Sequence, residues 1–230
     1  MGVQITKIIH QTWKDNRIPE EFQAFSCSWR NHHPGWEYRL WTNADNLDFI
    51  RREYHWFLPF FDNYQLDIQR ADAVRYFILY TYGGVYVDLD FECFKPIEPL
   101  LDDHECVLAL EPERHCQKHG VEQIISNAFM ASVPRHPLFY AVAKDMAFHV
   151  PSATHLNDLV LETTGPIMLS RVYSGFPDRE TVSLLPPKFL FPFDYEEARR
   201  FIVSHDSQLR LKLRDSYGVH YHWGSWWRHG

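Results

Sequence analysis

The chain has 230 residues, and its 30 acidic and 23 basic side chains give a formal net charge of −7. This length fits one α/β domain that buries a core without disulfides or a structural metal. The acidic balance argues against a dedicated nucleic-acid-binding protein. With no run of 18 apolar residues and no secretory pattern at the start, we expect no transmembrane helix and no signal peptide. The four cysteines form no Cys-x-x-Cys pair, so we expect reduced thiols.

The first part of the chain alternates strand and helix patterns. β-Branched residues open the first segment, and Pro19 with the two glutamates after it is typical of a helix start. A strand–helix–strand–helix order favours a parallel sheet covered by helices. The expected elements are a strand at 5–13, a helix at 19–31, a strand at 36–41 and a helix at 43–54.

The most periodic helix is expected at residues 64–82. Apolar side chains recur on most of its faces, so we expect it to lie deep in the domain and to end at Gly83-Gly84. The later patterns are weaker, and we find no repeat, low-complexity tract or linker. Further strands are expected at 85–87, 106–110 and 124–131, and further helices at 137–149 and 165–173.

Two carboxylates, Asp88 and Asp90, stand at the end of the strand that follows this helix. Side chains two apart on a strand share a face, and the carboxyl end of a strand is where open α/β sheets bind ligands. Two carboxylates pointing together repel each other unless a cation or proton lies between them. Mn²⁺ and Mg²⁺ prefer oxygen ligands, and either ion neutralises a diphosphate group that leaves a sugar. The pair therefore predicts a metal site, although a solvated acidic loop fits the same two residues.

Asp72 and Arg75 lie three residues apart on the otherwise apolar helix that leads into this strand. One interpretation is a local ion pair that contributes a few tenths of a kcal/mol. However, a charged pair on so apolar a helix needs either full hydrogen bonding or a polar ligand. A donor sugar with many hydroxyl groups is such a ligand.

The tail carries a second group of polar and aromatic residues: His220, His222, Ser225 and Trp226. Imidazole completes a manganese site, and a serine hydroxyl can donate to a phosphate oxygen. The tryptophan suits a lid that excludes water from an activated sugar. In an extended segment both histidines share one face, so either of them fits the metal and the other fits packing.

Four sequence runs occur together in one order: IIHQTW (8–13), SWRNHHPGWEYRLWT (28–42), RADAVRYFILYTYGGVYVDLD (70–90) and VHYHWGSW (219–226). Together they resemble glycosyltransferase family 32, which includes the yeast initiating outer-chain α-1,6-mannosyltransferase and bacterial capsule enzymes. The Asp-x-Asp region is also similar to that of the clostridial glucosylating toxins. NAFMASVPRHPLF (127–139) and ETTGPIML (162–169) extend the resemblance more loosely through the middle of the chain.

The resemblance implies one GT-A domain, with a Rossmann-like, mostly parallel sheet flanked by helices. In it, residues 5–100 bind the nucleotide-sugar, 101–216 form the acceptor side, and 217–230 contact metal and phosphate. The implied reaction is a retaining transfer of a hexose from a UDP- or GDP-sugar to a glycan, lipid-linked or polysaccharide acceptor, dependent on Mn²⁺ or Mg²⁺. We expect no membrane anchor of the kind that eukaryotic members carry, and therefore a cytoplasmic protein that contacts a membrane peripherally when the acceptor is lipid-linked.

Three alternatives remain beside this reading. The same residues also fit an inactive protein that only binds nucleotide-sugar or carbohydrate, or a toxin-like transferase acting on protein. A phosphatase of the haloacid-dehalogenase type also places Asp-x-Asp at a strand end. That chemistry requires Thr or Val where this chain has Glu92, which argues against it.

The resemblance also implies roles for individual residues, carried over by position. We expect the edge of the nucleotide pocket at His10, Gln11 and Trp13, although packing of the first strand also explains His10 and Trp13. Asp72 and Arg75 hold the donor sugar and its phosphate, and Asn127 lies beneath the anomeric carbon. We expect Tyr86 to contact the donor, and Asp88 to contact both the ribose and the metal. Asp90 and His220 are the other expected metal ligands, with His222 as the alternative to His220. Ser225 and Trp226 are expected to form a lid that contacts the phosphate.

Overall fold

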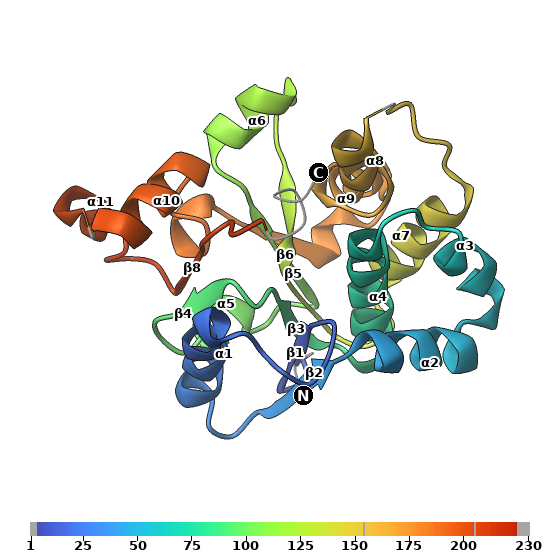
Figure 1. The fold of residues 1–230 in the computed structure, drawn as a ribbon, viewed down its shortest axis with the longest axis horizontal. Helices are drawn as coiled ribbons and strands as arrows, with labels where there is room; N and C mark the ends of the chain where they lie inside the picture. Colours follow the sequence, from blue (N-terminus) through green and yellow to red (C-terminus); the bar gives the residue numbers. More distant parts are fainter. Residues whose placement is uncertain (1–3, 154, 205, 225–230) are drawn as a thin grey trace.

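A six-stranded mixed sheet forms the centre of the protein, in the order β2-β1-β3-β6-β5-β7 (Figure 1). The computed structural model describes residues 4–153, 155–204 and 206–224. Three of the five strand pairings are parallel, and β6 runs antiparallel to both of its neighbours. The expected α/β domain with a mostly parallel sheet is therefore confirmed. The strands are β1 (Ile8–Thr12), β2 (Glu37–Trp41), β3 (Gly84–Val87), β5 (Cys106–Leu110), β6 (Ile125–Ser132) and β7 (Val182–Leu185).

Helices cover both faces of this sheet. In Figure 1, α4, α7, α8 and α9 lie on one side, and α1, α10 and α11 lie on the other. Side chains alternate along the strands, so one core contains Tyr86 and Leu108 and the other contains Val85 and Val107. The helices are α1 (Glu20–His32), α2 (Asn43–Glu53), α3 (Leu58–Asp62), α4 (Asp67–Tyr82), α5 (Glu98–Leu101), α6 (Glu113–His119), α7 (Pro137–Phe148), α8 (Leu156–Thr163), α9 (Pro166–Gly175), α10 (Tyr195–Ser204) and α11 (Ser207–Lys212). None of the helices within the described ranges is long and apolar enough to cross a membrane.

Helix α4 leads the chain into the candidate site. It is buried on most sides, as its apolar periodicity predicts, and it begins at Asp67 rather than at residue 64. Gly83 and Gly84 end it with φ angles of +64° and +87°. A Cβ atom on Gly84 would lie 2.6 Å from the carbonyl oxygen of Ile8, so only glycine lets the chain enter β3 this close to β1.

A small second sheet attaches the tail to the Asp-x-Asp segment. Strand β4 (Phe91–Cys93) pairs antiparallel with β8 (Gly218–His220), so that Phe91 lies opposite His220. More than 120 residues separate the two strands along the chain. The tail is thereby placed beside the turn that follows β3, at the carboxyl edge of the main sheet.

Candidate active site

A cavity of about 840 Å³ opens at the carboxyl ends of β3 and β5. Elements from distant parts of the sequence surround it: α4, the turn after β3, the end of β5, β6 and the tail. It gathers eight of the residues expected from the sequence. These are Trp13, Asp72, Arg75, Asp88, Asp90, Asn127, His220 and His222.

Arg75 is the centre of the hydrogen-bonding network on one wall. Its guanidinium lies 2.6 Å from the Asp72 carboxylate and 3.3 Å from the Asp88 carboxylate, and it donates to the Asn127 carbonyl oxygen at 2.8 Å. It also lies over the Tyr86 ring, 4.5 Å from the ring centroid. The pair predicted on α4 is thus a buried bridge between α4, the Asp-x-Asp turn and β6.

Burial dominates the electrostatics of this wall. It raises the pKa of the Asp72 carboxyl to about 7, although the neighbouring Arg75 acts in the opposite direction. The Nε of Arg75 and the Nδ2 of Asn127 are buried and have no hydrogen-bond partner among the described residues. Such donors are costly unless a polar ligand accepts from them, so this wall suits a ligand rich in oxygen atoms.

The two carboxylates of the Asp-x-Asp segment have different surroundings. Asp88 follows β3 directly and accepts a hydrogen bond from the Tyr86 hydroxyl at 2.8 Å, whereas Asp90 lies in the turn before β4. Burial raises the pKa of Asp88, with partial compensation by Arg75. Despite its burial, the pKa of Asp90 is lowered because His220 and the Trp223 N–H stabilise the carboxylate.

Asp88, Asp90 and His220 form a cluster suited to a metal ion. One ligand atom from each lies within 4.8 Å of the others. His220 Nε2 lies 3.0 Å from Asp90, and the ring stacks on Phe91 across the β4–β8 pair. The Nδ1 atom of this ring is buried without a partner among the described residues. Two carboxylates and one imidazole are ligands that Mn²⁺ accepts, so the residues present fit the expected ion.

His222 lies next to this cluster but outside it. Its ring centroid is 4.2 Å from that of His220, and its backbone has a left-handed φ of +49°. Burial and the neighbouring His220 lower the pKa of His222 well below its usual value. Its Nε2 is buried and has no hydrogen-bond partner among the described residues, and the residue lines the cavity.

His10 and Gln11 lie behind the cavity and do not line it. His10 is fully buried between the Gly83 carbonyl and the Trp41 indole, and burial lowers its pKa to about 4. Gln11 donates to the Asp88 carbonyl oxygen at 3.2 Å and accepts from the Tyr38 hydroxyl. Gln11 therefore holds the backbone of the Asp-x-Asp turn from the side away from the cavity.

Aromatic side chains form another part of the cavity rim. Trp13 meets Phe22 edge-on at 5.6 Å, and Phe22 meets Trp223 in the same way at 5.8 Å. This rim offers apolar surface for a nucleobase or a sugar face. The two lid residues expected from the sequence, Ser225 and Trp226, lie outside the described residues.

The site also contains residues that the sequence patterns did not single out. Glu111 directly follows β5, and His115 lies one helical turn later on α6. Tyr195, at the start of α10, stacks on the His115 ring with centroids 3.6 Å apart. The position of Glu111 after a predicted strand was an available signal, because Asp88 occupies the equivalent place after β3.

A mixed sheet covered by helices, with a cavity and carboxylates at its carboxyl edge, is the arrangement of the GT-A fold. Residues 19–107 match the family described as a glycosyltransferase sugar-binding region containing a DXD motif. This part of the chain carries the sugar-binding region of glycosyltransferase family 32.

Comparisons with known proteins agree with this match. The chain is 40% identical over 184 residues to inositol phosphoceramide mannosyltransferase 3 of Schizosaccharomyces pombe, covering 76% of this chain and 48% of that protein. It is 35% identical over 222 residues to inositol phosphoceramide mannosyltransferase 2 of the same yeast, covering 96% and 58%. The chain thus spans about half the length of these relatives. The solved structure of PaToxG glycosyltransferase shares the fold, with a TM-score of 0.55 at 17% identity over 76% of this chain and 71% of that one.

Proposed function

We propose that this chain is a metal-dependent, retaining glycosyltransferase that moves a hexose from a nucleotide-sugar to a hydroxyl group of a glycolipid or glycan. The observation that carries the proposal is the joining of Asp88, Asp90 and His220 to the Asp72–Arg75 pair in one cavity. The match to the family's sugar-binding region supports the class of reaction, and retention is the stereochemical course that the family resemblance implies.

Different residues of the cavity bind the two ends of the donor, its diphosphate and its sugar. Asp88, Asp90 and His220 would hold a divalent ion, which when bound neutralises the charge of the leaving diphosphate. Arg75 adds a fixed positive charge on the same side, and Asp72 accepts hydrogen bonds from hydroxyl groups of the donor sugar. Asn127, through its unpartnered amide, donates to an oxygen of the same sugar. The aromatic rim of Trp13, Phe22 and Trp223 excludes water from the reacting centre.

The yeast relatives favour a particular pair of substrates. They are named as mannosyltransferases of inositol phosphoceramide, and they are 40% and 35% identical to this chain over 184 and 222 residues. We therefore propose mannose as the preferred sugar and an inositol-containing phospholipid as the preferred acceptor.

The test is turnover of a panel of UDP- and GDP-sugars with and without Mn²⁺, using inositol phosphoceramide in detergent micelles as acceptor. We expect GDP-mannose to be used and chelation to stop the reaction, and the anomeric configuration of the product, read by NMR, to match that of the donor. Asp90→Asn should lower turnover about 10²- to 10³-fold because it removes a charge that stabilises the transition state through the ion.

Glu92→Gln is the matched control for this substitution. Glu92 lies two residues further along, on β4, and bonds the Tyr221 hydroxyl rather than lining the cavity. Full activity of Asp90→Asn, or equal losses in the two variants, would reject the metal assignment. The absence of turnover with every donor would reject the proposed reaction.

A further inference from the structure

Glu111 occupies the same place after β5 that Asp88 occupies after β3. Because β6 is antiparallel to both β3 and β5, those two strands run in the same direction and end at the same edge of the sheet (Figure 1). Neighbouring strands are spaced about 4.8 Å apart, so strands on either side of β6 lie about 10 Å apart. Glu111 therefore lines the cavity on the far side of β6 from the carboxylates of the Asp-x-Asp turn.

The Glu111 carboxylate is held in one orientation. Its Oε2 lies 2.8 Å from His115 Nδ1, and His115 Nε2 accepts a hydrogen bond from the Tyr195 backbone N–H at 3.1 Å. Since Nε2 acts as an acceptor, the proton of the neutral ring is on Nδ1 and is donated to Glu111. Glu111 is 9% exposed, and its Oε1 has no hydrogen-bond partner within the described ranges.

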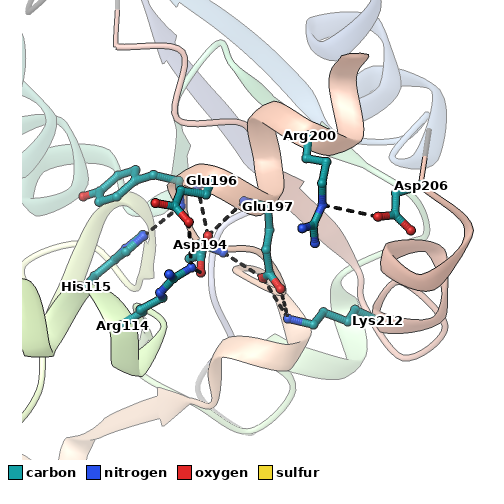
Figure 2. Close-up of polar contacts among 9 residues, drawn as sticks. Arg114, His115, Asp194, Glu196, Glu197, Arg200, Asp206 and Lys212 are labelled. Atoms are coloured by element: carbon teal, nitrogen blue, oxygen red, sulfur yellow. Dashed lines mark hydrogen bonds and ion pairs between the residues drawn. The ribbon is translucent and has the colours of Figure 1, made fainter. Parts of the chain in front are cut away.

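A wider network fixes the backbone that holds His115. Figure 2 shows Asp194, just before α10, accepting from Arg114 at 2.9 Å and from the N–H groups of Glu196 and Glu197. These contacts tie α6 to the first turn of α10, where the Tyr195 N–H meets His115. The orientation of Glu111 thus depends on two helices and not on a flexible loop.

Glu111 is also separated from the metal cluster. The cluster of ligand atoms found among the described residues comprises Asp88, Asp90 and His220, and Glu111 is not part of it. The His222 ring packs beside both His220 and His115, with its centroid 4.2 Å from that of His220 and 5.0 Å from that of His115. A carboxylate at this place repels phosphate and accepts hydrogen bonds from hydroxyl groups.

We propose that Glu111 binds the acceptor, accepting a hydrogen bond through Oε1 from a hydroxyl group of the acceptor's sugar or inositol ring, and that His115 positions it. This inference rests on the proposed function and assigns the β5 side of the cavity to the acceptor. The donor lies on the β3 side, where Asp72, Arg75 and the metal cluster gather.

The substitution Glu111→Gln tests this assignment. Glutamine has the same shape and still accepts from His115 through its carbonyl, but it presents an NH₂ group where the carboxylate presents an accepting oxygen. Two rates are measured with GDP-mannose and Mn²⁺: hydrolysis without acceptor, and transfer to inositol phosphoceramide in micelles. We expect the ratio of transfer to hydrolysis to fall at least 10-fold and the KM for the acceptor to rise, because a hydrogen bond to a charged group is lost.

Glu113→Gln is the matched control, and His115→Phe tests positioning. Glu113 lies on the same helix, bonds Gln117 and does not line this cavity, so its substitution should leave the ratio as in the wild type. His115→Phe keeps a ring against Tyr195 but removes the hydrogen-bond donor to Glu111. We expect a smaller rise in the acceptor KM than in Glu111→Gln, and again a larger effect on transfer than on hydrolysis.

Each outcome separates the inference from the function on which it rests. A wild-type ratio in Glu111→Gln, or equal falls in hydrolysis and transfer, would overturn the inference while the transferase activity stands. A wild-type protein that neither hydrolyses nor transfers any sugar would reject the proposed function and the inference together.

Discussion

Two buried polar groups lie on either side of the Asp-x-Asp turn, and they differ in whether their hydrogen bonds are complete. Behind the turn, both nitrogens of His10 are bonded, to Gly83 and to Trp41. Facing the cavity, Arg75, Asn127 and His220 each keep a buried nitrogen without a partner among the described residues. Buried polar atoms in folded proteins are normally paired, so incomplete pairing marks the face where a ligand completes the network. The first group supports the fold, and the second forms the site.

Removing Arg75 should give the largest effect on stability. Arg75→Met leaves Asp72 and Asp88 buried without their cation, which we expect to lower the free energy of unfolding by about 3–5 kcal/mol. Urea unfolding measures this loss. Arg70→Gln is the control, because Arg70 lies on the same helix but pairs with an exposed carboxylate, that of Asp67. A loss below about 1 kcal/mol, or equal losses in both variants, would contradict the view that Arg75 joins the two carboxylates.

His10 should affect how the stability of the protein depends on pH, and it should not affect activity. Its imidazole takes up a proton near pH 6.5 in the unfolded chain but only near pH 4 in the folded protein. The unfolded state therefore binds more protons as the pH falls from 6.5 to 4, and His10 costs the folded state about 2–3 kcal/mol by pH 4.5. His10→Gln removes this imidazole. Urea unfolding at pH 7.5 and 4.5 should therefore show that the free energy of unfolding falls less on acidification in the variant than in the wild type. Equal acid losses would show that His10 is accessible to protons in the folded protein.

Asp72 should give the smallest effect, and its contribution to stability should depend on pH in the opposite direction to that of His10. Burial raises the pKa of this carboxyl to about 7, so in the folded protein it loses its proton only as the pH rises through neutrality. If the ionised form binds the donor, affinity for the nucleotide-sugar should rise about threefold between pH 6.5 and 7.5. Calorimetric titration with Mn²⁺ present measures this rise, and Asp72→Asn should flatten it. For stability the sign reverses, since the folded state holds this proton more tightly and gains stability as the pH falls below 7.

Much of the fold was predictable from local patterns. The β-branched opening, the apolar periodicity of α4 and the two glycines after it correspond to β1, α4 and the entry into β3. The strand at 106–110 has the same bounds in the structure. By contrast, helices α6, α8, α10 and α11 were not predicted, because they are short and their apolar faces pack on distant elements.

The site was predictable in its residues but not in its arrangement. Sequence patterns singled out Asp72, Arg75, Asp88, Asp90 and the two tail histidines, and the resemblance added Asn127. Which histidine completes the metal cluster depends on the pairing of β4 with β8, which places His220 opposite Phe91. No local pattern reports a pairing between strands more than 120 residues apart.

The amino-acid sequence by itself determined which side chains are ionisable and where the strongly patterned elements β1, α4 and β3 lie, because those properties depend on residue type and on spacing along the chain. The tertiary structure alone decided that His10 is enclosed while Glu111 faces the cavity. Enclosure depends on which elements pack together, and here the direction of β6 places the ends of β3 and β5 at one edge.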